Sequence, residues 1–139
     1  MLEEISVDWR IQAIRGATTV SQNSAGDIAA ATHELLDAIE AQNRLSPEHI
    51  ISVTFSVTKD LDALFPAAAA RQRPGWDAVP LLDVQHMYVV GSLPRCIRVL
   101  IHTQVPVLHE EVAHIYLREA QTLRPDLGDP AVSVPSSRE

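Results

Sequence analysis

The sequence contains a single cysteine, Cys96, among its 139 residues. One cysteine excludes an intrachain disulfide, so we expect a protein of a reducing compartment in which Cys96 is a small apolar residue within a strand. The acidic N-terminal residues are followed by no apolar segment, which argues against a signal peptide. No apolar run reaches the length of about 18 residues that a membrane span needs. Together these absences predict a cytoplasmic protein.

Positive charge is also scarce. The net charge is −7 and the sequence pI is about 5.3, which argues against nucleic acid or an anionic membrane as the partner. Lys59 is the only lysine, and the other ten basic residues are arginines. An anionic ligand would therefore have to be bound by a local group of arginines, whose guanidinium groups suit bidentate contact with carboxylates.

Several motifs of common catalytic sites are missing. With only five glycines, the chain has no P-loop, no G-x-G-x-x-G and no G-x-S-x-G. His109 and His114 resemble a zincin pair, but a spacing of five places them about 140° apart around a helix, so they cannot share an ion. We therefore predict neither a metal, a cofactor nor a nucleophile.

What is present suits one domain. Hydrophobic residues make up 46% of the chain, enough for a single core. We predict an N-terminal extension over residues 1–8, an ordered domain over 9–127, and a flexible tail rich in proline and serine over 128–139.

Strand and helix patterns alternate along the ordered part. Period-two or β-branched runs predict strands over 9–15, 51–57, 79–84 and 96–101, and an apolar stripe predicts a helix over 27–42. Pro66 and Pro74-Gly75 bracket a second, short helix. Residues 109–114 favour a helix, whereas 115–123 are ambiguous. We predict an α+β fold with a small mixed sheet of about five strands, two main helices, and one sheet face covered by another subunit.

Arg98 interrupts the apolar strand 96–101. A guanidinium in such a strand needs an anionic partner, either a carboxylate of the protein or an anionic ligand, and the sequence leaves both open. Other polar residues with no obvious base or nucleophile among them lie near element ends: Arg15, Arg71, Arg124, Tyr116, Asp83 and His86. Such a set suits a site that binds a substrate and stabilises developing charge.

Motifs in a fixed order along the chain support one family resemblance. They are Ile14–Val20, Leu64–Ala67 with Arg71, Val79-Pro80, Gly91–Val99, His114–Leu117 and Leu123–Leu127. In these the chain resembles the monofunctional chorismate mutases of the AroH class. The resemblance implies a homotrimeric pseudo-α/β-barrel with helices on one face of each sheet, an active site at each subunit interface, and Tyr116 on a strand. It also implies the Claisen rearrangement of chorismate to prephenate, in phenylalanine and tyrosine biosynthesis.

The resemblance assigns roles to individual residues. Arg98 would contact the enolate oxygen that develops as the ether bond breaks, and Arg15 and Tyr116 would hold the carboxylate and ether side of the substrate. The substrate-binding residues implied in addition, some of them from the neighbouring subunit, are Phe65, Ala67, Ala68, Arg71, Leu81, Leu82, Leu123 and Arg124.

The chain departs from the family pattern at two nearby positions. His86 stands where the typical member has a glutamate that accepts the ring hydroxyl of the substrate, and Asp83 stands where a cysteine is usual. Because the two changes occur together, we expect Asp83 to supply the missing carboxylate and His86 to be a neutral hydrogen-bond partner or a bystander. Ala68 replaces a lysine found in some members, which predicts weaker binding of the substrate carboxylates.

Two other functions compete with this interpretation. One is an enamine/imine deaminase of the Rid type, also a trimer with an interfacial arginine that binds a carboxylate. The other is a trimer that binds a small dicarboxylate without turnover. The motif series argues against the deaminase, and a carboxylate at Asp83 argues against a lapsed site.

Overall fold

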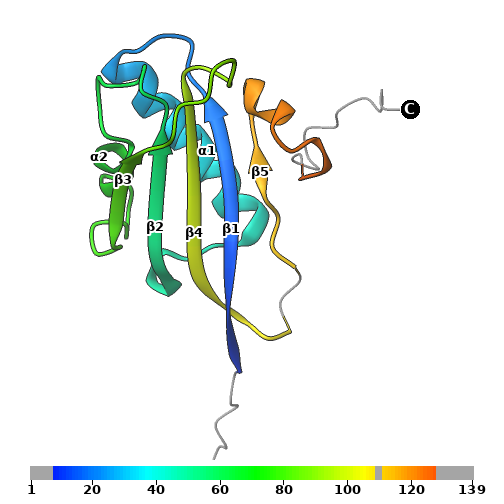
Figure 1. The fold of residues 1–139 in the computed structure, drawn as a ribbon. Helices are drawn as coiled ribbons and strands as arrows, with labels where there is room; N and C mark the ends of the chain where they lie inside the picture. Colours follow the sequence, from blue (N-terminus) through cyan, green and yellow to red (C-terminus); the bar gives the residue numbers. More distant parts are fainter. Residues whose placement is uncertain (1–7, 109–110, 128–139) are drawn as a thin grey trace, which may run out of the picture.

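The computed structural model describes residues 8–108 and 111–127, which form one mixed five-stranded sheet in the order β3-β2-β4-β1-β5 (Figure 1). β4 pairs antiparallel with β1 on one side and with β2 on the other. The edge strands β5 and β3 pair in parallel with β1 and β2, respectively. The strands are β1 (Trp9–Thr19), β2 (Ile50–Val57), β3 (Leu81–Gln85), β4 (Cys96–Pro106) and β5 (Ile115–Tyr116). The predicted α+β fold with a small mixed sheet is confirmed.

Two α-helices, α1 (Ala25–Asn43) and α2 (Pro66–Arg71), lie on the same face of this sheet (Figure 1). Ser24 caps the start of α1, where its hydroxyl accepts the backbone N–H of Asp27 at 3.1 Å, and Arg44, the residue after the last turn, adopts the left-handed conformation. Pro66 opens α2, a position where its missing N–H costs nothing. Three short 3₁₀ helices complete the described elements: Pro47–His49, Arg118–Thr122 and Pro125–Leu127.

The hydrophobic core lies between the sheet and these helices. Side chains alternate along each strand, so Ile14 of β1 and Ile101 of β4, which are paired, both point into the core and are fully buried. Gly16 lets α1 approach the sheet closely, because a Cβ there would lie 2.9 Å from Cδ1 of Ile39. The buried residues of α1, which include Ile28, Leu35 and Ile39, recur at the helical spacing seen in the sequence.

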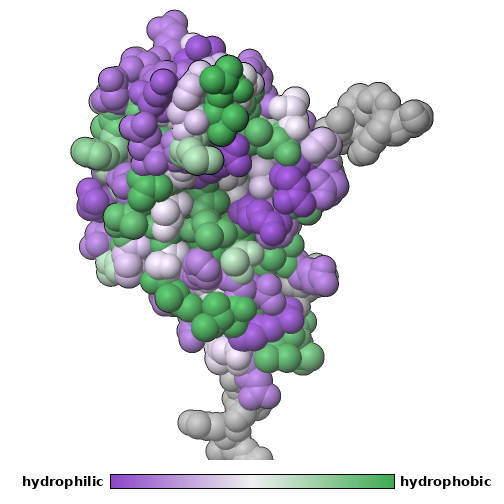
Figure 2. All heavy atoms as spheres, in the orientation of Figure 1, coloured by the Kyte–Doolittle hydropathy of each residue, from purple (hydrophilic) through white to green (hydrophobic). Residues whose placement is uncertain are grey.

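The opposite face of the sheet carries no α-helix among the described elements. At its β5 edge the 3₁₀ helix Arg118–Thr122 packs over Ala17 and Tyr116, and the rest of the face presents a mixture of apolar and polar side chains (Figure 2). Leu82, Val84 and Leu100 belong to this open face and are 57%, 39% and 39% exposed. None of the helices in the described part of the chain is long and apolar enough to cross a membrane.

Several predicted boundaries were wrong. The strand predicted over 9–15 continues to Thr19, the one over 96–101 continues to Pro106, and the one over 79–84 begins only at Leu81. The two long strands extend because they pair with each other over their full length.

The helix predicted over 109–114 is also wrong in its described part, residues 111–114, which are not helical. The side chain of Asn43 accepts the N–H of Ala113 at 2.7 Å and donates to its carbonyl at 2.9 Å. These bonds replace helical partners and lead the chain into β5. Residues 109–110, the tail 128–139 and nearly all of the predicted extension 1–8 lie outside the described residues.

Candidate functional site

Four strands bring one residue each to a row across the open face. Arg98 of β4 is paired with Ser56 of β2 on one side and with Ala17 of β1 on the other, and Ala17 is paired with Tyr116 of β5. Residues paired across strands point to the same face of a sheet. The strand register therefore places the Arg98 guanidinium on the open face, flanked by a serine, a small residue and a phenol.

Arg98 has no acidic partner among the described residues. Arg73, Arg118 and Arg124 form ion pairs with carboxylates, whereas no described carboxylate forms one with Arg98, which is exposed. The sequence left open whether its partner is a protein carboxylate or an anionic ligand. Within residues 8–108 and 111–127 no carboxylate neutralises it, so its charge is available to a ligand. Its neighbour Cys96 is 1% exposed, and burial raises the pKa of that thiol.

Arg15 lies on the same face, paired with Leu100 two positions along from Arg98. Its backbone N–H donates to Nδ1 of His114 at 3.0 Å. Burial lowers the pKa of His114, and the positive charges of Arg15 and Arg124 lower it further. A neutral imidazole therefore accepts this bond and ties the segment before β5 to β1, beside a hollow of about 600 Å³ that Arg15, His114 and Leu100 line.

Tyr116 packs at the β5 edge of this face and is 5% exposed. Leu123 packs against a small cluster of Tyr116, Ala17 and Ala120. Arg124 is exposed and pairs with Asp126, with Nη2 and Oδ2 3.0 Å apart. The structure thus brings Leu123 to Tyr116, while Arg124 is engaged with its own neighbour.

His86 follows the end of β3 and returns to the same row of residues. Its Nδ1 lies 2.9 Å from Oγ of Ser56, the β2 partner of Arg98. Burial lowers the pKa of the half-buried imidazole, and the nearby charge of Arg98 lowers it further, against smaller opposing effects of the Ser56 backbone and Asp60. The lowered pKa favours the neutral form of His86 next to the cation.

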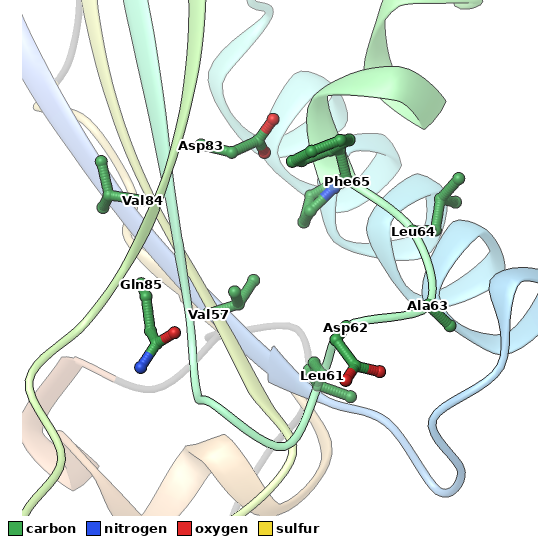
Figure 3. A pocket seen from close by; sticks show the side chains of 10 residues that line it. Val57, Leu61, Asp62, Ala63, Leu64, Phe65, Asp83, Val84 and Gln85 are labelled. Atoms are coloured by element: carbon green, nitrogen blue, oxygen red, sulfur yellow. The ribbon is translucent and has the colours of Figure 1, made fainter.

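Asp83 points to the other side of β3. Its Oδ1 accepts the backbone N–H of Ala67 at 3.0 Å, at the start of α2. Burial raises the pKa of this carboxyl, while the Ala67 N–H and the charge of Arg71 act in the opposite direction. Figure 3 shows the carboxyl directed toward Phe65 across a cavity of about 460 Å³, with Val84 directed away from it.

Of the remaining predicted residues, Phe65 lines this cavity, and the others lie on α2 or β3. Phe65 is 69% exposed at its rim, and Ala67 is buried beneath. Leu81 packs against the core on the same side of β3, whereas Leu82 faces the open side. Ala68 lies half-buried within α2, and Arg71 is exposed at its end.

Within one chain the predicted residues therefore form two groups on opposite sides of the sheet. The arginine group contains Arg98, Arg15, Tyr116 and His86. The α2 group contains Phe65, Ala67, Arg71 and Asp83. The separation of Asp83 from His86, only three residues apart, follows from the alternation of side chains in β3 and the turn after it. Neither group alone encloses a ligand, because both are open to the surface.

Two residues that contact the arginine group, Ser56 and His114, are absent from the predicted site residues. The sequence presents Ser56 only as a polar position in a half-buried strand, and His114 only in the rejected zincin spacing and at the start of the family motif His114–Leu117. The period of two along 50–57 gave the face of Ser56 but could not give its partner, because His86 reaches it through an irregular turn. No local signal indicated the bond between His114 and Arg15, which are 99 positions apart.

Comparisons with known proteins identify the family of this chain. The chain belongs to the chorismate mutase type I family, whose model matches residues 11–127. Two curated relatives are named chorismate mutase AroH. The one from Bacillus subtilis (strain 168) is 42% identical over 117 residues, which are 84% of this chain and 92% of the relative. The one from Thermus thermophilus is 48% identical over 118 residues, which are 84% of this chain and 96% of the relative.

A solved structure, the chorismate mutase from Clostridium thermocellum, superposes with a TM-score of 0.74 at 45% identity, covering 80% of this chain and 98% of the other. The prediction of an AroH-class chorismate mutase, an intramolecular isomerase, is thus confirmed. The roles of single residues stay predictions.

Proposed function

We propose that this protein converts chorismate to prephenate in the cytoplasm, on the route to phenylalanine and tyrosine, with Arg98 as the main catalytic residue. The observation that carries the proposal is the Arg98 guanidinium, exposed on the open face and without a carboxylate partner among the described residues. A substrate with two carboxylates and a developing enolate oxygen supplies the anionic partner that the described residues do not.

The reaction needs positioning and charge stabilisation more than acid–base chemistry. As the ether C–O bond breaks and the new C–C bond forms, negative charge collects on the ether oxygen and no proton moves. A fixed guanidinium beside that oxygen stabilises the transition state more than the ground state. We assign this contact to Arg98, with Arg15 and Tyr116 holding the carboxylate and ether side. Leu123 would form part of the wall, and Arg124 would help to close the site.

A second copy of the chain would join the two groups of residues. The open face exposes apolar side chains such as Leu82, and Phe65 projects from the rim of the α2 group. We propose a homotrimer in which the α2 group of one subunit meets the arginine group of the next. Phe65, Ala67, Ala68 and Arg71 would then contact the substrate from the neighbouring subunit, with Leu81 and Leu82 as part of the wall.

Asp83 belongs to the α2 group in this arrangement. Within residues 8–108 and 111–127 only its Oδ1 is engaged, by the N–H of Ala67, so we propose that its second oxygen faces the substrate and supplies the carboxylate absent at position 86. The substitution Asp83→Asn is then expected to lower kcat/KM. If Asp83→Asn keeps most of kcat/KM while His86→Ala loses it, this role of Asp83 is contradicted.

The direct test is the loss of chorismate absorbance with the purified full-length chain, with prephenate identified as the product. Turnover supports the mutase. Binding of chorismate without turnover supports the dicarboxylate-binding trimer instead, and the absence of both leaves an enamine/imine substrate to be assayed for deamination. Sedimentation equilibrium on the same sample tests the trimer.

A further inference from the structure

The turn that follows β2 carries a carboxylate beside the start of β4. We propose that Asp60 is a positioning residue, which fixes the start of β4 and through it the guanidinium of Arg98. This inference rests on the proposed function, since it takes the charge of Arg98 to act on the substrate. Asp60 acts through Arg98 and does not itself contact the substrate.

Arg98 lies close to the end of the sheet at which β4 begins. The last pair that β4 forms with β2 joins Ile97 to Val57, and the last pair that it forms with β1 joins Cys96 to Thr19. The end of a strand opens more readily than its centre. A catalytic side chain one or two positions from such an end therefore needs further contacts to hold its place.

The first such contact is a chain of hydrogen bonds from β4 to the turn after β2. The N–H of Cys96 donates to Oγ1 of Thr58 at 2.9 Å, and the Thr58 hydroxyl donates to Oδ1 of Asp60. A hydroxyl has one proton to donate, and a carboxylate only accepts. Asp60 therefore takes this proton and leaves a lone pair of Thr58 for the N–H of Cys96. Without the carboxylate, the other acceptor described for this proton is the Cys96 carbonyl, at 3.5 Å.

The second contact holds the residue before β4. Arg95 has a φ of 47°, in the left-handed region that residues other than glycine seldom adopt. Its N–H donates to both carboxylate oxygens of Asp60, at 3.2 and 3.0 Å. On the other side its carbonyl accepts the N–H of Val20 at 2.9 Å, and its Nε donates to the Val20 carbonyl at 3.0 Å. The chain thus enters β4 tied to the turn after β2 and to the end of β1.

Loss of the Asp60 carboxylate releases both contacts on the side of β2. Arg95 can then leave the left-handed conformation, and the N–H of Cys96 is held less firmly. Only Ile97 separates Cys96 from Arg98, so this movement reaches the guanidinium. A displacement of about 1 Å in a catalytic group can cost about 100-fold in rate, and we expect kcat to fall about 10- to 100-fold in Asp60→Ala.

A double-mutant cycle separates positioning from a general loss of structure. The kcat of Asp60→Ala is measured in the parent protein and in protein with citrulline in place of Arg98. We expect the full loss in the first background and less than about a twofold loss in the second, because the charge to be positioned is then absent. Equal losses in the two backgrounds overturn the proposal.

Thr58 and Asp77 supply the companion variants. Thr58→Val removes the hydroxyl at nearly the same shape, and we expect it to lower kcat at least about fivefold, whereas Thr58→Ser keeps the hydroxyl and stays within about twofold of the parent. Asp77→Ala, which removes an exposed carboxylate elsewhere, is the matched control and leaves kcat unchanged. A Thr58→Val protein as active as the parent contradicts the chain of hydrogen bonds.

Amide hydrogen exchange tests the same contacts without reference to activity. In the full-length Asp60→Ala protein we expect the amides of Arg95 and Cys96 to exchange at least about tenfold faster than in the parent. The amide of Ile101, at the centre of β4, keeps its rate. Unchanged exchange at Arg95 and Cys96, or an equal rise at Ile101, overturns the proposal. If the parent protein does not convert chorismate, the proposed function fails, while the exchange rates still decide whether Asp60 fixes the start of β4.

Discussion

The side chain of Asn43 links the end of α1 to the segment that leads into β5, so its removal is a strong test of the fold around the site. Asn43 is 5% exposed, accepts the N–H of Ala113 at 2.7 Å and donates to the Ala113 carbonyl at 2.9 Å. It also donates to the carbonyl of Ile39 at 3.0 Å. Tyr116 follows Ala113 by three positions, so the same bonds help to place the phenol of the arginine group.

The substitution Asn43→Ala removes both bonds to Ala113 and leaves its backbone groups with no partner in a partly buried place. Each net hydrogen bond contributes about 1 kcal/mol, and an unsatisfied buried group costs about 1–3 kcal/mol. The two backbone groups of Ala113 left unsatisfied together cost about 2–6 kcal/mol. Water reaches part of this segment, so we take the lower half of that range and expect the free energy of unfolding to fall by about 2–4 kcal/mol. We expect kcat/KM to fall severalfold as well, through displacement of Tyr116.

Urea denaturation at one fixed protein concentration measures this change, since the stability of an oligomer depends on concentration. The control is Gln42→Ala, the exposed neighbour on the same helix, for which we expect a change within about 0.5 kcal/mol. A loss below 1 kcal/mol for Asn43→Ala, or an equal loss for both variants, would refute the reasoning about the link to β5.

Two further substitutions test other parts of the account. In Gly16→Ala the new Cβ would lie 2.9 Å from Cδ1 of Ile39, so we expect the free energy of unfolding in urea to fall by about 1–3 kcal/mol. The control is Gly26→Ala, whose new Cβ would have nothing within 4 Å. An equal loss in the control would contradict the steric argument. The pKa of Asp83 is raised from 3.8, so the folded state binds its proton more tightly than the unfolded state and loses stability as pH rises through the folded pKa. Urea denaturation from pH 4 to 8 measures the free energy of unfolding, and we expect the value for Asp83→Asn to rise relative to the parent as pH rises. The exposed control Asp77→Asn should show no such rise. A difference between Asp83→Asn and the parent that shrinks as pH rises would contradict the argument.

The sequence predicted the elements better than their limits. Periodicity located β2 and α1 to within a few residues, because each has one face in the core and one outside it. It placed a helix over 109–114, because the local propensity there is helical and nothing local reveals that Asn43 holds Ala113. Long-range hydrogen bonds of this kind override propensity and are not visible in a window of neighbouring residues.

In the candidate site, too, some features could be predicted from the local sequence and others depended on the fold. Arg98 could be singled out from the sequence because a charge in an apolar strand is anomalous wherever the strand lies. The separation of Asp83 from His86 could not be foreseen. It depends on where β3 ends, since Asp83 still follows the alternation of the strand, whereas His86 turns back toward Ser56. Sequence reasoning gave the two residues different roles in one pocket and did not foresee that they lie in different groups within one chain.

The central claim concerns the positive charge of Arg98. Replacing Arg98 by citrulline keeps the shape of the side chain and removes the charge, and Arg44→citrulline, at the exposed end of α1, is the matched control. We expect the first protein to form prephenate about 10²- to 10³-fold more slowly in kcat, the usual effect of losing one such donor, and the second to match the parent. An undiminished kcat with citrulline at position 98 would contradict the account.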